Sequence, residues 1–539
     1  MGFSGRCWPL RLGTAGLSVM LVTTGCSNGG LSDTKKAAES STADALASYY
    51  RQKVNWHPCP EPVQTMQCAT VSVPVSYADP AGRSIKLAVD KIPATDPAGR
   101  LGSLLVDPGG PGGSGVQYVA GSQDTFKTLA THYDVIGFDP RGIGFSDPVK
   151  CLDDKQMDAY LDTDFDPAAT RQAVRTLQAV KRYADSCQEN TGPLLAQVGT
   201  ANVARDMDVI RGALGDRKLD YLGISYGTYI GQEYARLFPS HVGRMVLDSV
   251  DNPEQDAADD QPDAAESQFD KAVSTILTDC TRKPSCPVGT APDQTGAKLN
   301  ALLARLAEHP APAEDGRALT SSLARMALLQ ATYSPTLWGP LDEGLTQAER
   351  GHGEALLQIA DQSNGRAPDG GYSTEKTGLY SVNCLEAGNA RKTVDQAATE
   401  LMANRKELNA YSPIFGVMLA VQGDVCSFWP VAGQPRTAIS SSEVPPILML
   451  NNTGDAATPL TDAEQVVKRF AGARLVINES EGHGVYPTEA NTCARTITDN
   501  YLFSGTLPAQ ATTTCKPAAQ TADGDPLTEP AALDTAGGD

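Results

Sequence analysis

The stretch Gly223-Ile224-Ser225-Tyr226-Gly227 decides the fold predicted for this chain. It follows an apolar run, residues 219–222, that is typical of a buried strand, and it precedes residues 228–235, which have helical character. The pattern G-x-S-x-G between a strand and a helix is typical of a nucleophile elbow, in which the serine occupies a sharp turn. The flanking glycines leave room for the two backbones. The alternative is an ordinary Gly/Ser turn, so the assignment depends on finding catalytic partners for Ser225.

The amino-acid composition limits the kinds of binding partner that we expect. The chain has 539 residues, with 44 Lys and Arg against 64 Asp and Glu, and a formal net charge of -20. This charge opposes binding to nucleic acid or to an anionic membrane surface, so we expect neither as an electrostatic partner. Apolar residues make up 41% of the chain, which is enough for a sizeable core. The length allows one large domain with an insertion, or two domains.

The first 26 residues are typical of a lipoprotein signal peptide. A basic region with Arg6 and Arg11 precedes the apolar run 12–22, which is too short to span a bilayer. Thr23-Thr24-Gly25-Cys26 then resembles a bacterial lipobox, with Cys26 as the lipidation site. A threonine replaces the usual leucine, so simple secretion is the alternative. We expect an exported protein of the cell envelope, attached to the outer face of the membrane only through this lipid, or secreted.

Ten further cysteines follow the signal region and its own Cys7 and Cys26. An even number in an exported chain predicts disulfides. Pairing each cysteine with its sequence neighbour gives five local bridges: Cys59/Cys68, Cys151/Cys187, Cys280/Cys286, Cys384/Cys426 and Cys493/Cys515. Proximity is the only basis for this pairing, and ten cysteines allow many other connectivities. No C-x-x-C pair occurs and the six histidines are scattered, so we expect no metal site and no cofactor.

Apolar runs alternate with helical patterns, which predicts an α/β fold with a mostly parallel sheet. Seven strands are expected, at residues 85–89, 103–106, 133–138, 219–222, 245–247, 447–450 and 475–477. Strand signals stop after Asp251 and resume at Val444, so a helical insertion divides the sheet. The expected organisation is a signal peptide 1–26, a polar linker 27–50, core 51–252, helical cap 253–440, core 441–516 and a disordered tail 517–539. Residues 202–214 form one expected helix, with Thr200 as its cap.

A serine nucleophile needs a base, and the base needs a carboxylate that orients it. In hydrolases of the elbow type these groups follow in the order Ser, acid, His. His483 lies in a glycine-flanked loop after the last predicted strand, from which it can reach the carboxyl edge of the sheet. Its alternative is a plain loop histidine. We expect His483 to be the base, because the other histidines lie before the sheet, beside earlier elements or in the insertion.

The acid is expected at the end of the preceding strand. Asp455 follows that strand, and its alternative is a turn-forming aspartate beside Gly454. The second candidate acid is Asp248, which ends the strand after the elbow helix. Asp139 is expected instead to pair with Arg141 and to brace a loop.

An oxyanion hole needs donors that already point at the developing charge. The backbone N–H of Tyr226, next to the serine, is the first expected donor. The loop Asp107-Pro108-Gly109-Gly110-Pro111-Gly112-Gly113 supplies the second, because its glycines let bare backbone approach a substrate carbonyl. Gly110 is the preferred donor and Gly109 the next. A phosphate-binding loop is the competing interpretation, but no Gly-Lys-Ser/Thr sequence follows it.

These motifs together resemble the tripeptidyl aminopeptidase family of exported actinobacterial α/β-hydrolases, a group similar to mycobacterial envelope serine hydrolases and proline iminopeptidase-like peptidases. The resemblance covers nearly the whole mature length. The matching motifs are Val54-Asn55-Trp56, Pro108-Gly109-Gly110-Pro111-Gly112, Gly137-Phe138-Asp139-Pro140-Arg141-Gly142, Gly223-Ile224-Ser225-Tyr226-Gly227-Thr228, Cys426-Ser427-Phe428-Trp429-Pro430 and Gly454-Asp455 with Thr458-Pro459. The resemblance implies an α/β-hydrolase core with a helical cap, Ser225 as nucleophile, Asp455 as acid and His483 as base. It also implies that Thr458 steadies the acid loop.

Members of this family remove short peptides from free N-termini, which requires an acid that binds the substrate ammonium. Asn383-Cys384-Leu385-Glu386 matches a family stretch that usually contains Cys-x-Asp, so Glu386 is the expected amine-binding residue. Glu386 replaces the usual aspartate, and its extra methylene leaves the length of the released peptide open. The alternative is a solvated acid beside a disulfide.

Three functions remain open on the sequence. The first is a serine exopeptidase, of the tripeptidyl aminopeptidase type, whose substrates are peptides or proteins with free N-termini. The second keeps the same triad but acts as a carboxylesterase or lipase on envelope lipids. The third is a surface lipoprotein that binds peptides without catalysis. The natural substrate and the oligomeric state are not predicted.

Overall fold

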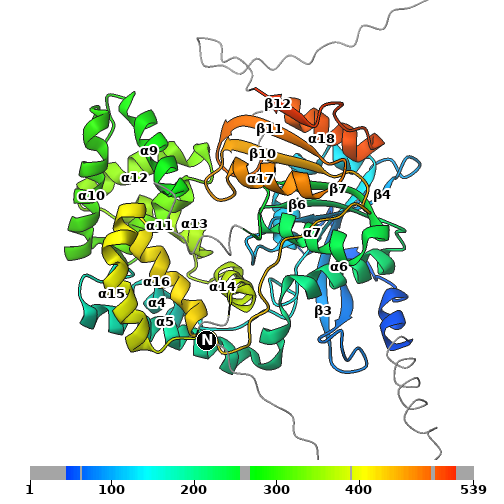
Figure 1. Cartoon of the computed structure of the whole chain (residues 1–539), viewed down its shortest axis with the longest axis horizontal. Coiled ribbons are helices and arrows are strands. Elements are labelled where there is room, and N and C mark those ends of the chain that lie inside the picture. The colour runs from blue at the N-terminus through cyan, green and yellow to red at the C-terminus, as the bar shows by residue number, and fades with distance from the viewer. Residues whose placement is uncertain (1–43, 61–62, 255–266, 389–390, 487–491, 517–539) are drawn as a thin grey trace, which may run out of the picture.

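The computed structural model describes residues 44–60, 63–254, 267–388, 391–486 and 492–516 (Figure 1). The expected signal peptide with Cys26 and the expected C-terminal tail lie outside these residues. In the expected linker, residues 44–50 are described and are helical. The hydroxyl of Tyr50 donates a hydrogen bond to Asp208 at 2.8 Å, so this segment packs against the core.

One large sheet forms the core. Its strands in the described residues run in the order β1-β2-β3-β5-β4-β6-β7-β10-β11-β12. Their bounds are β1 His57–Pro58, β2 Gln67–Pro74, β3 Ser84–Ile92, β4 Gly102–Asp107, β5 Tyr133–Phe138, β6 Leu219–Ile224, β7 Val242–Asp248, β10 Leu448–Gly454, β11 Arg474–Glu481 and β12 Thr512–Cys515. The pairs β1/β2, β2/β3 and β3/β5 are antiparallel, and the other pairs are parallel. The mostly parallel α/β sheet predicted from the sequence is therefore confirmed.

Both faces of the central strands are buried, which explains why β4, β6 and β7 are rich in apolar residues. In β4, Leu104 and Val106 point to one face and Leu105 to the other, and all three are fully buried. The first face packs against helices α2 (Gly115–Gly121), α3 (Gln123–Phe126) and α18 (Thr492–Ser504). The second packs against α6 (Thr200–Leu214), α7 (Tyr226–Leu237) and α17 (Leu460–Val466). This three-layer arrangement is the α/β-hydrolase core.

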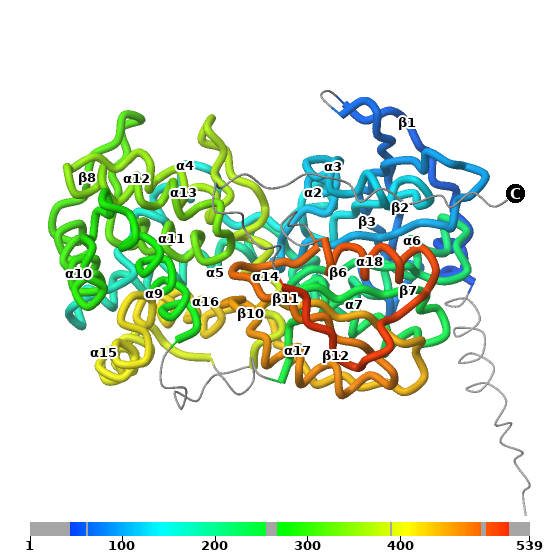
Figure 2. The backbone as a smooth tube through the Cα atoms, turned by 90° about the horizontal axis from the view of Figure 1, so that it is seen from above, coloured from blue at the N-terminus to red at the C-terminus, as the bar shows by residue number. Residues whose placement is uncertain are grey.

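A helical part, the cap, lies beside the carboxyl edge of the sheet (Figures 1 and 2). It contains α9 Gln268–Thr281, α10 Pro292–Glu308, α11 Ser321–Ala331, α12 Trp338–Glu349, α13 Glu354–Asn364, α14 Glu375–Glu386, α15 Val394–Tyr411 and α16 Gly416–Ser427, with a short hairpin of β8 Ala311–Pro312 and β9 Ala318–Leu319. Helices α4 (Asp154–Leu161) and α5 (Thr170–Thr191), which follow β5, join this part, because α5 packs on α15 and α16. The helical part therefore draws on two separate segments of the chain.

Within this helical part, α14 lies between the other helices and the sheet (Figure 1). It meets the glycine-rich loop after β4 at very short range. A Cβ added to Gly112 would lie 2.3 Å from the Glu375 carbonyl oxygen, and one added to Gly378 would lie 2.6 Å from the Gly112 Cα. Only glycine fits at these two positions, and this contact sets the distance between the cap helix and the loop that borders the serine.

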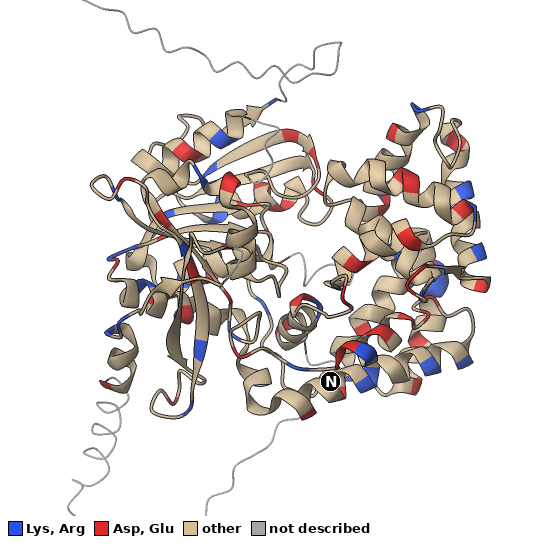
Figure 3. Ribbon diagram, turned by 180° about the vertical axis from the view of Figure 1, so that it is seen from behind, with Lys and Arg blue, Asp and Glu red and all other residues tan. Residues whose placement is uncertain are grey.

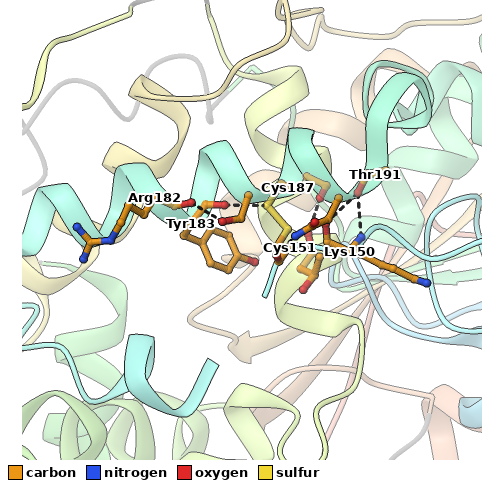
Figure 4. Close-up of a disulfide and its surroundings, with 10 residues drawn as sticks. Lys150, Cys151, Arg182, Tyr183, Cys187 and Thr191 are labelled. Carbon is orange, nitrogen blue, oxygen red and sulfur yellow. Dashed lines mark hydrogen bonds between the residues drawn. A yellow bond between two sulfur atoms is a disulfide. The ribbon is translucent and has the colours of Figure 1, made fainter. Parts of the chain in front are cut away.

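Five disulfides join Cys59 to Cys68, Cys151 to Cys187, Cys280 to Cys286, Cys384 to Cys426 and Cys493 to Cys515. These are the neighbour pairs expected from the sequence. Figure 4 shows the bridge between Cys151 and Cys187 on α5. Beside it, the Thr191 hydroxyl accepts from the Lys150 N–H and donates to the Lys150 carbonyl. The bridge therefore fastens the loop after β5 to the long helix of the cap.

Charged residues occur along the ribbon in both parts of the molecule, with Asp and Glu on the sheet side as well as on the cap helices (Figure 3). Within the part of the chain that the structure describes, no helix has the length and apolar character needed to cross a bilayer.

Two local expectations are wrong. Thr200 does not cap α6 through its side chain: Gly199 is the cap residue, and the Thr200 hydroxyl is used elsewhere. Arg141 does not pair with Asp139 but with Asp206, at 2.6 Å and fully buried. Asp139 instead accepts hydrogen bonds from the Ser114 hydroxyl and the Phe145 N–H. In both cases the fold brings a residue that is distant in the chain into contact, Glu386 for Thr200 and Asp206 for Arg141.

Candidate active site

The turn at Ser225 has the strained geometry expected of a nucleophile elbow. Its φ and ψ are 58° and -127°, a conformation that is rare outside glycine, and the residue lies between the end of β6 and the start of α7. A Cβ on Gly223 would lie 2.4 Å from the Gly227 carbonyl oxygen, and one on Gly227 would lie 2.7 Å from the Asp107 carbonyl oxygen. The two glycines are therefore required by close packing of strand, helix and neighbouring loop.

His483 and Asp455 form a direct pair. The imidazole Nδ1 lies 2.9 Å from Oδ2 and 3.0 Å from Oδ1 of Asp455. Asp455 is itself held by the Thr458 N–H at 2.9 Å and by the Thr458 hydroxyl at 3.0 Å. Thr458 thus steadies the acid loop, as the family resemblance implies.

The second ring nitrogen of His483 is available for proton transfer. Nε2 is buried and has no hydrogen-bond partner among the described residues. Because Nδ1 faces a carboxylate, the Nδ1–H tautomer is favoured and Nε2 carries the lone pair. Burial on its own lowers the pKa of His483, but the carboxylates of Asp455 and Asp248 outweigh burial and raise the pKa above its ordinary value.

The three residues follow the ends of parallel strands of one sheet. Ser225 follows β6, Asp455 follows β10 and His483 follows β11, so all three lie at the carboxyl edge of the sheet. Strand β7, which separates β6 from β10, links them: the Asp248 carbonyl accepts the Ser225 N–H at 2.9 Å, and its carboxylate accepts the Tyr486 N–H at 2.7 Å. Asp248 therefore contacts the main chain around both the serine and the histidine.

The N–H groups expected to form the oxyanion hole differ in whether they already have a hydrogen-bond acceptor. Tyr226 is the first residue of α7, where N–H groups have no acceptor inside the helix. Gly110 borders the same cavity as Ser225 and Tyr226. The Gly109 N–H is already donated to Asp107 at 2.8 Å, so Gly109 is not free to bind an oxyanion. Gly109 has a packing role instead, because a Cβ there would lie 2.4 Å from the Ile224 carbonyl oxygen.

A cavity of about 670 Å³ opens between the sheet edge and the cap. Ser225, Tyr226 and Gly110 line one side, and Phe269 and Tyr333 of the cap line another. Within the part of the chain that the structure describes, the charged lining residues are Asp251, Glu386, Asp462 and Arg436, which gives three carboxylates against one guanidinium. The cavity is therefore acidic at neutral pH and suits a cationic group of a ligand.

Glu386 lies at this cavity, and its carboxylate is extensively bound. Oε1 accepts the Thr200 N–H at 2.7 Å and also the Thr200 hydroxyl, while Oε2 accepts from Arg436 Nε at 2.9 Å. The hydroxyl of Tyr226 is hydrogen-bonded to the Thr200 hydroxyl. Arg436 also approaches Asp251 at 3.4 Å. Glu386 is thus one member of a charged cluster rather than a solvated acid.

Sequence reasoning missed several residues of this site. Arg436 and Thr200 lie far from Glu386 in the chain, and nothing in their local sequence marks them as its partners. Tyr333 was also missed: its carbonyl accepts the His483 N–H at 2.8 Å, and its ring packs edge-on against the imidazole at 5.2 Å. No local signal could have identified these contacts, since each joins separate segments. In the described residues, no group of three His, Cys, Asp or Glu side chains is arranged to hold a metal ion.

Comparisons with known proteins agree on one family. A family model described as TAP-like protein matches residues 412–515. The chain is 33% identical to the tripeptidyl aminopeptidase of Streptomyces lividans over 501 residues, covering 88% of this chain and 89% of that protein. It is 34% identical to carboxylesterase B of Mycobacterium tuberculosis over 473 residues (84% and 88%) and 31% identical to serine protease Hip1 of the same species over 482 residues (85% and 90%).

Proposed function

The chain belongs to the tripeptidyl aminopeptidase family of α/β-hydrolases, and on that premise we propose that it is a serine exopeptidase that releases short peptides from free N-termini. The observation that carries the proposal is the Asp455–His483 pair, at the sheet edge where the strained Ser225 turn begins α7. A nucleophile, a base and an orienting acid at three strand ends on one sheet edge are the parts that acyl transfer needs.

The proposed reaction has two halves. His483 Nε2 accepts the Ser225 hydroxyl proton while Oγ attacks the scissile carbonyl carbon, and the Gly110 and Tyr226 N–H groups stabilise the oxyanion. The imidazolium then gives its proton to the leaving amine, the C–N bond breaks, and the N-terminal fragment remains esterified to Ser225. Water next attacks the ester: His483 accepts its proton and returns it to Ser225, and the short peptide leaves as a carboxylic acid.

We propose that the cluster of Glu386, Asp251 and Arg436, termed the acidic cluster, binds the substrate ammonium. Among the described residues, Glu386 and Asp251 carry two negative charges against the positive charge of Arg436, which gives this part of the cluster a negative excess. An ammonium bound there would border the same cavity as Ser225, where we propose that the scissile bond lies. The separation between cluster and serine would then set the length of the released peptide.

A second function is favoured by one observation, the 34% identity to carboxylesterase B. Esters and amides use the same triad, so the substrate decides between the two. Three carboxylates in the cavity lining favour a cationic peptide end over the apolar chain of a lipid. We therefore keep the peptidase as the proposal and the esterase as its competitor.

We also propose that the protein works outside the cytoplasm, as a lipid-anchored or secreted enzyme. The five disulfides support this location, because such bonds persist in oxidising compartments. Mass spectrometry of the mature N-terminus from an actinobacterial host tests the anchor at Cys26: a diacylglyceryl cysteine supports it, and an unmodified downstream terminus supports secretion.

Chromogenic substrates test the activity. Ala-Pro-Ala and Pro derivatives, each with a free or a blocked amine, are compared with a short acyl ester. Blocking the amine is expected to lower kcat/KM of the tripeptide more than about 10-fold, because the acidic cluster loses a charged partner. E386Q and D251N should shrink this difference, whereas S225A should abolish turnover. Equal turnover of free and blocked peptides would remove the exopeptidase assignment, and turnover of the ester alone would favour the esterase.

A further inference from the structure

The loop that carries His483 is held by side chains from β7 and β10. Gly484 N–H donates to the Ser249 hydroxyl at 2.8 Å, and the carbonyls of Gly482 and Gly484 accept from Asn452 Nδ2 at 2.9 and 3.0 Å. The Asn452 side-chain oxygen in turn accepts from Asn478 at 2.7 Å. The loop main chain is therefore bound on both sides of the imidazole.

The carboxylate of Asp248 also accepts hydrogen bonds from the main chain of this loop. Its carboxylate accepts the Val485 N–H at 2.9 and 3.0 Å and the Tyr486 N–H at 2.7 Å, and the side chain is fully buried. Its carbonyl accepts the Ser225 N–H at 2.9 Å. One residue at the end of β7 thus binds the backbone of the serine turn through its main chain and the backbone of the histidine loop through its side chain.

We propose that Asp248 is a positioning residue, which holds the His483 loop in register with the Ser225 turn and supplies a second negative charge beside the imidazole. The sequence marked Asp248 only as an alternative acid in the triad. The structure gives that place to Asp455, which contacts Nδ1 directly. This inference rests on the proposed serine-hydrolase mechanism.

Charge supports the same role. Among the described residues, the titratable groups whose charges interact with Asp248 are His483, Asp455 and the Tyr118 hydroxyl of α2. Burial raises the pKa of Asp248 to about 6, while the N–H groups of Tyr486 and Val485 and the charge of His483 oppose the rise. The carboxylate is therefore ionised above that pH and helps to raise the pKa of His483.

The substitution D248N tests both parts of the role. An amide offers one acceptor oxygen and places an NH₂ group where the second oxygen stood, so at least one buried N–H of the loop loses its partner. We expect kcat to fall about 10- to 100-fold with KM within about 2-fold, because the base is displaced while the cavity is unchanged. Without the second negative charge, the acid limb of the pH profile of kcat/KM should move to lower pH.

A matched control is D90N. Asp90 is also a buried strand aspartate that accepts a backbone N–H, from Gly137 at 3.1 Å, but it lies on β3 and does not contact the histidine loop. D90N is expected to keep the wild-type kcat and acid limb. Labelling of Ser225 by a fluorophosphonate measures activation of the serine without substrate, and it should slow in D248N but not in D90N.

A second variant covers the case in which D248N does not fold. Ser249 has a φ of 56°, so S249G relieves backbone strain while it removes the acceptor of the Gly484 N–H and changes no charge. We expect S249G to lower kcat and fluorophosphonate labelling with an unmoved acid limb. Wild-type kcat in folded D248N, or in S249G if D248N is unfolded, would overturn the inference. Residual wild-type turnover in S225A would instead overturn the proposed function itself.

Discussion

His483 Nδ1 lies 2.9 Å from Oδ2 of Asp455, and the Asp455 side chain is fully shielded from solvent. This contact joins the ends of two neighbouring strands, β10 and β11, whose residues pair in parallel. It turns one ring nitrogen toward the carboxylate and leaves the other for proton transfer.

The Asp455 contact predicts the pH dependence of catalysis. A base must be neutral to accept the serine proton, and the pKa of His483 is raised above its ordinary value. We therefore expect kcat/KM to rise with pH through a midpoint above about 6.5. In D455N the midpoint should move down and kcat should fall about 10³- to 10⁴-fold, because the tautomer is no longer held. Steady-state kinetics from pH 5 to 9 measure both. An unmoved midpoint in D455N would contradict the assignment of the acid.

Gly110 is predicted to be intolerant of a side chain. Its φ is 112°, and an added Cβ would lie 2.9 Å from the Gly112 nitrogen. G110A should shift the N–H that we assign to the oxyanion hole and lower kcat about 100-fold, with a small change in KM. The control is G215A, at a helix end with φ 81° and open space around the Cβ, which should leave kcat unchanged. Equal kcat values for the two variants would remove Gly110 from the hole.

The cluster around Arg436 is predicted to stabilise the fold. R436M leaves the carboxylate of Glu386, whose side chain is 5% exposed, without its cationic partner. We expect the free energy of unfolding to fall by about 3–5 kcal/mol. R305M breaks an exposed pair with Glu349 at a similar distance of 2.8 Å and should cost at most about 1 kcal/mol. Urea denaturation measures the free energy of unfolding of both variants. Comparable decreases in the two variants would show that burial does not make the Arg436 pair more stabilising than an exposed pair.

The disulfide Cys384–Cys426 is predicted to matter more than Cys280–Cys286. The first closes a loop with a sequence separation of 42 and the second one of 6, so loop entropy alone gives about 4 against about 2 kcal/mol. Cys426 also lines the cavity. The double serine variant at 384 and 426 should therefore lower both the melting temperature and kcat/KM, whereas the variant at 280 and 286 should lower only the melting temperature. The reverse order would contradict this account.

Asp90 is predicted to make stability depend on pH. Burial raises its pKa to about 8, against the opposing hydrogen bond from Gly137. Between pH 4 and 8 the folded protein keeps a proton that the unfolded chain releases, so this carboxyl destabilises the fold as pH rises through that window. D90N does not titrate, and its free energy of unfolding relative to wild type should increase from pH 5 to pH 9. The same difference at both pH values would show that Asp90 does not hold the proton.

Local patterns were sufficient for the sheet and for the catalytic candidates. Each predicted strand from residue 85 to residue 477 is present, because strands buried on one or both faces carry a recurring apolar signal. The short edge strands β1 and β12 and the strand β2 beside β1 were not predicted, since short, threonine-rich or alternating segments lack that signal. The order serine, acid, histidine predicted three strand ends that do lie at one sheet edge.

By itself, the sequence determined the features that depend on residues close together in the chain. These are the glycines around Ser225, the apolar strands and the neighbouring cysteines that could reach one another. Only the tertiary structure decided which partners those elements would meet. Glu386 binds Thr200, 186 residues away, and the cap residue Tyr333 supports the His483 loop, because packing of the cap on the sheet creates these distances. A buried charge or N–H takes whichever partner folding places within reach, and separation along the chain does not encode that choice.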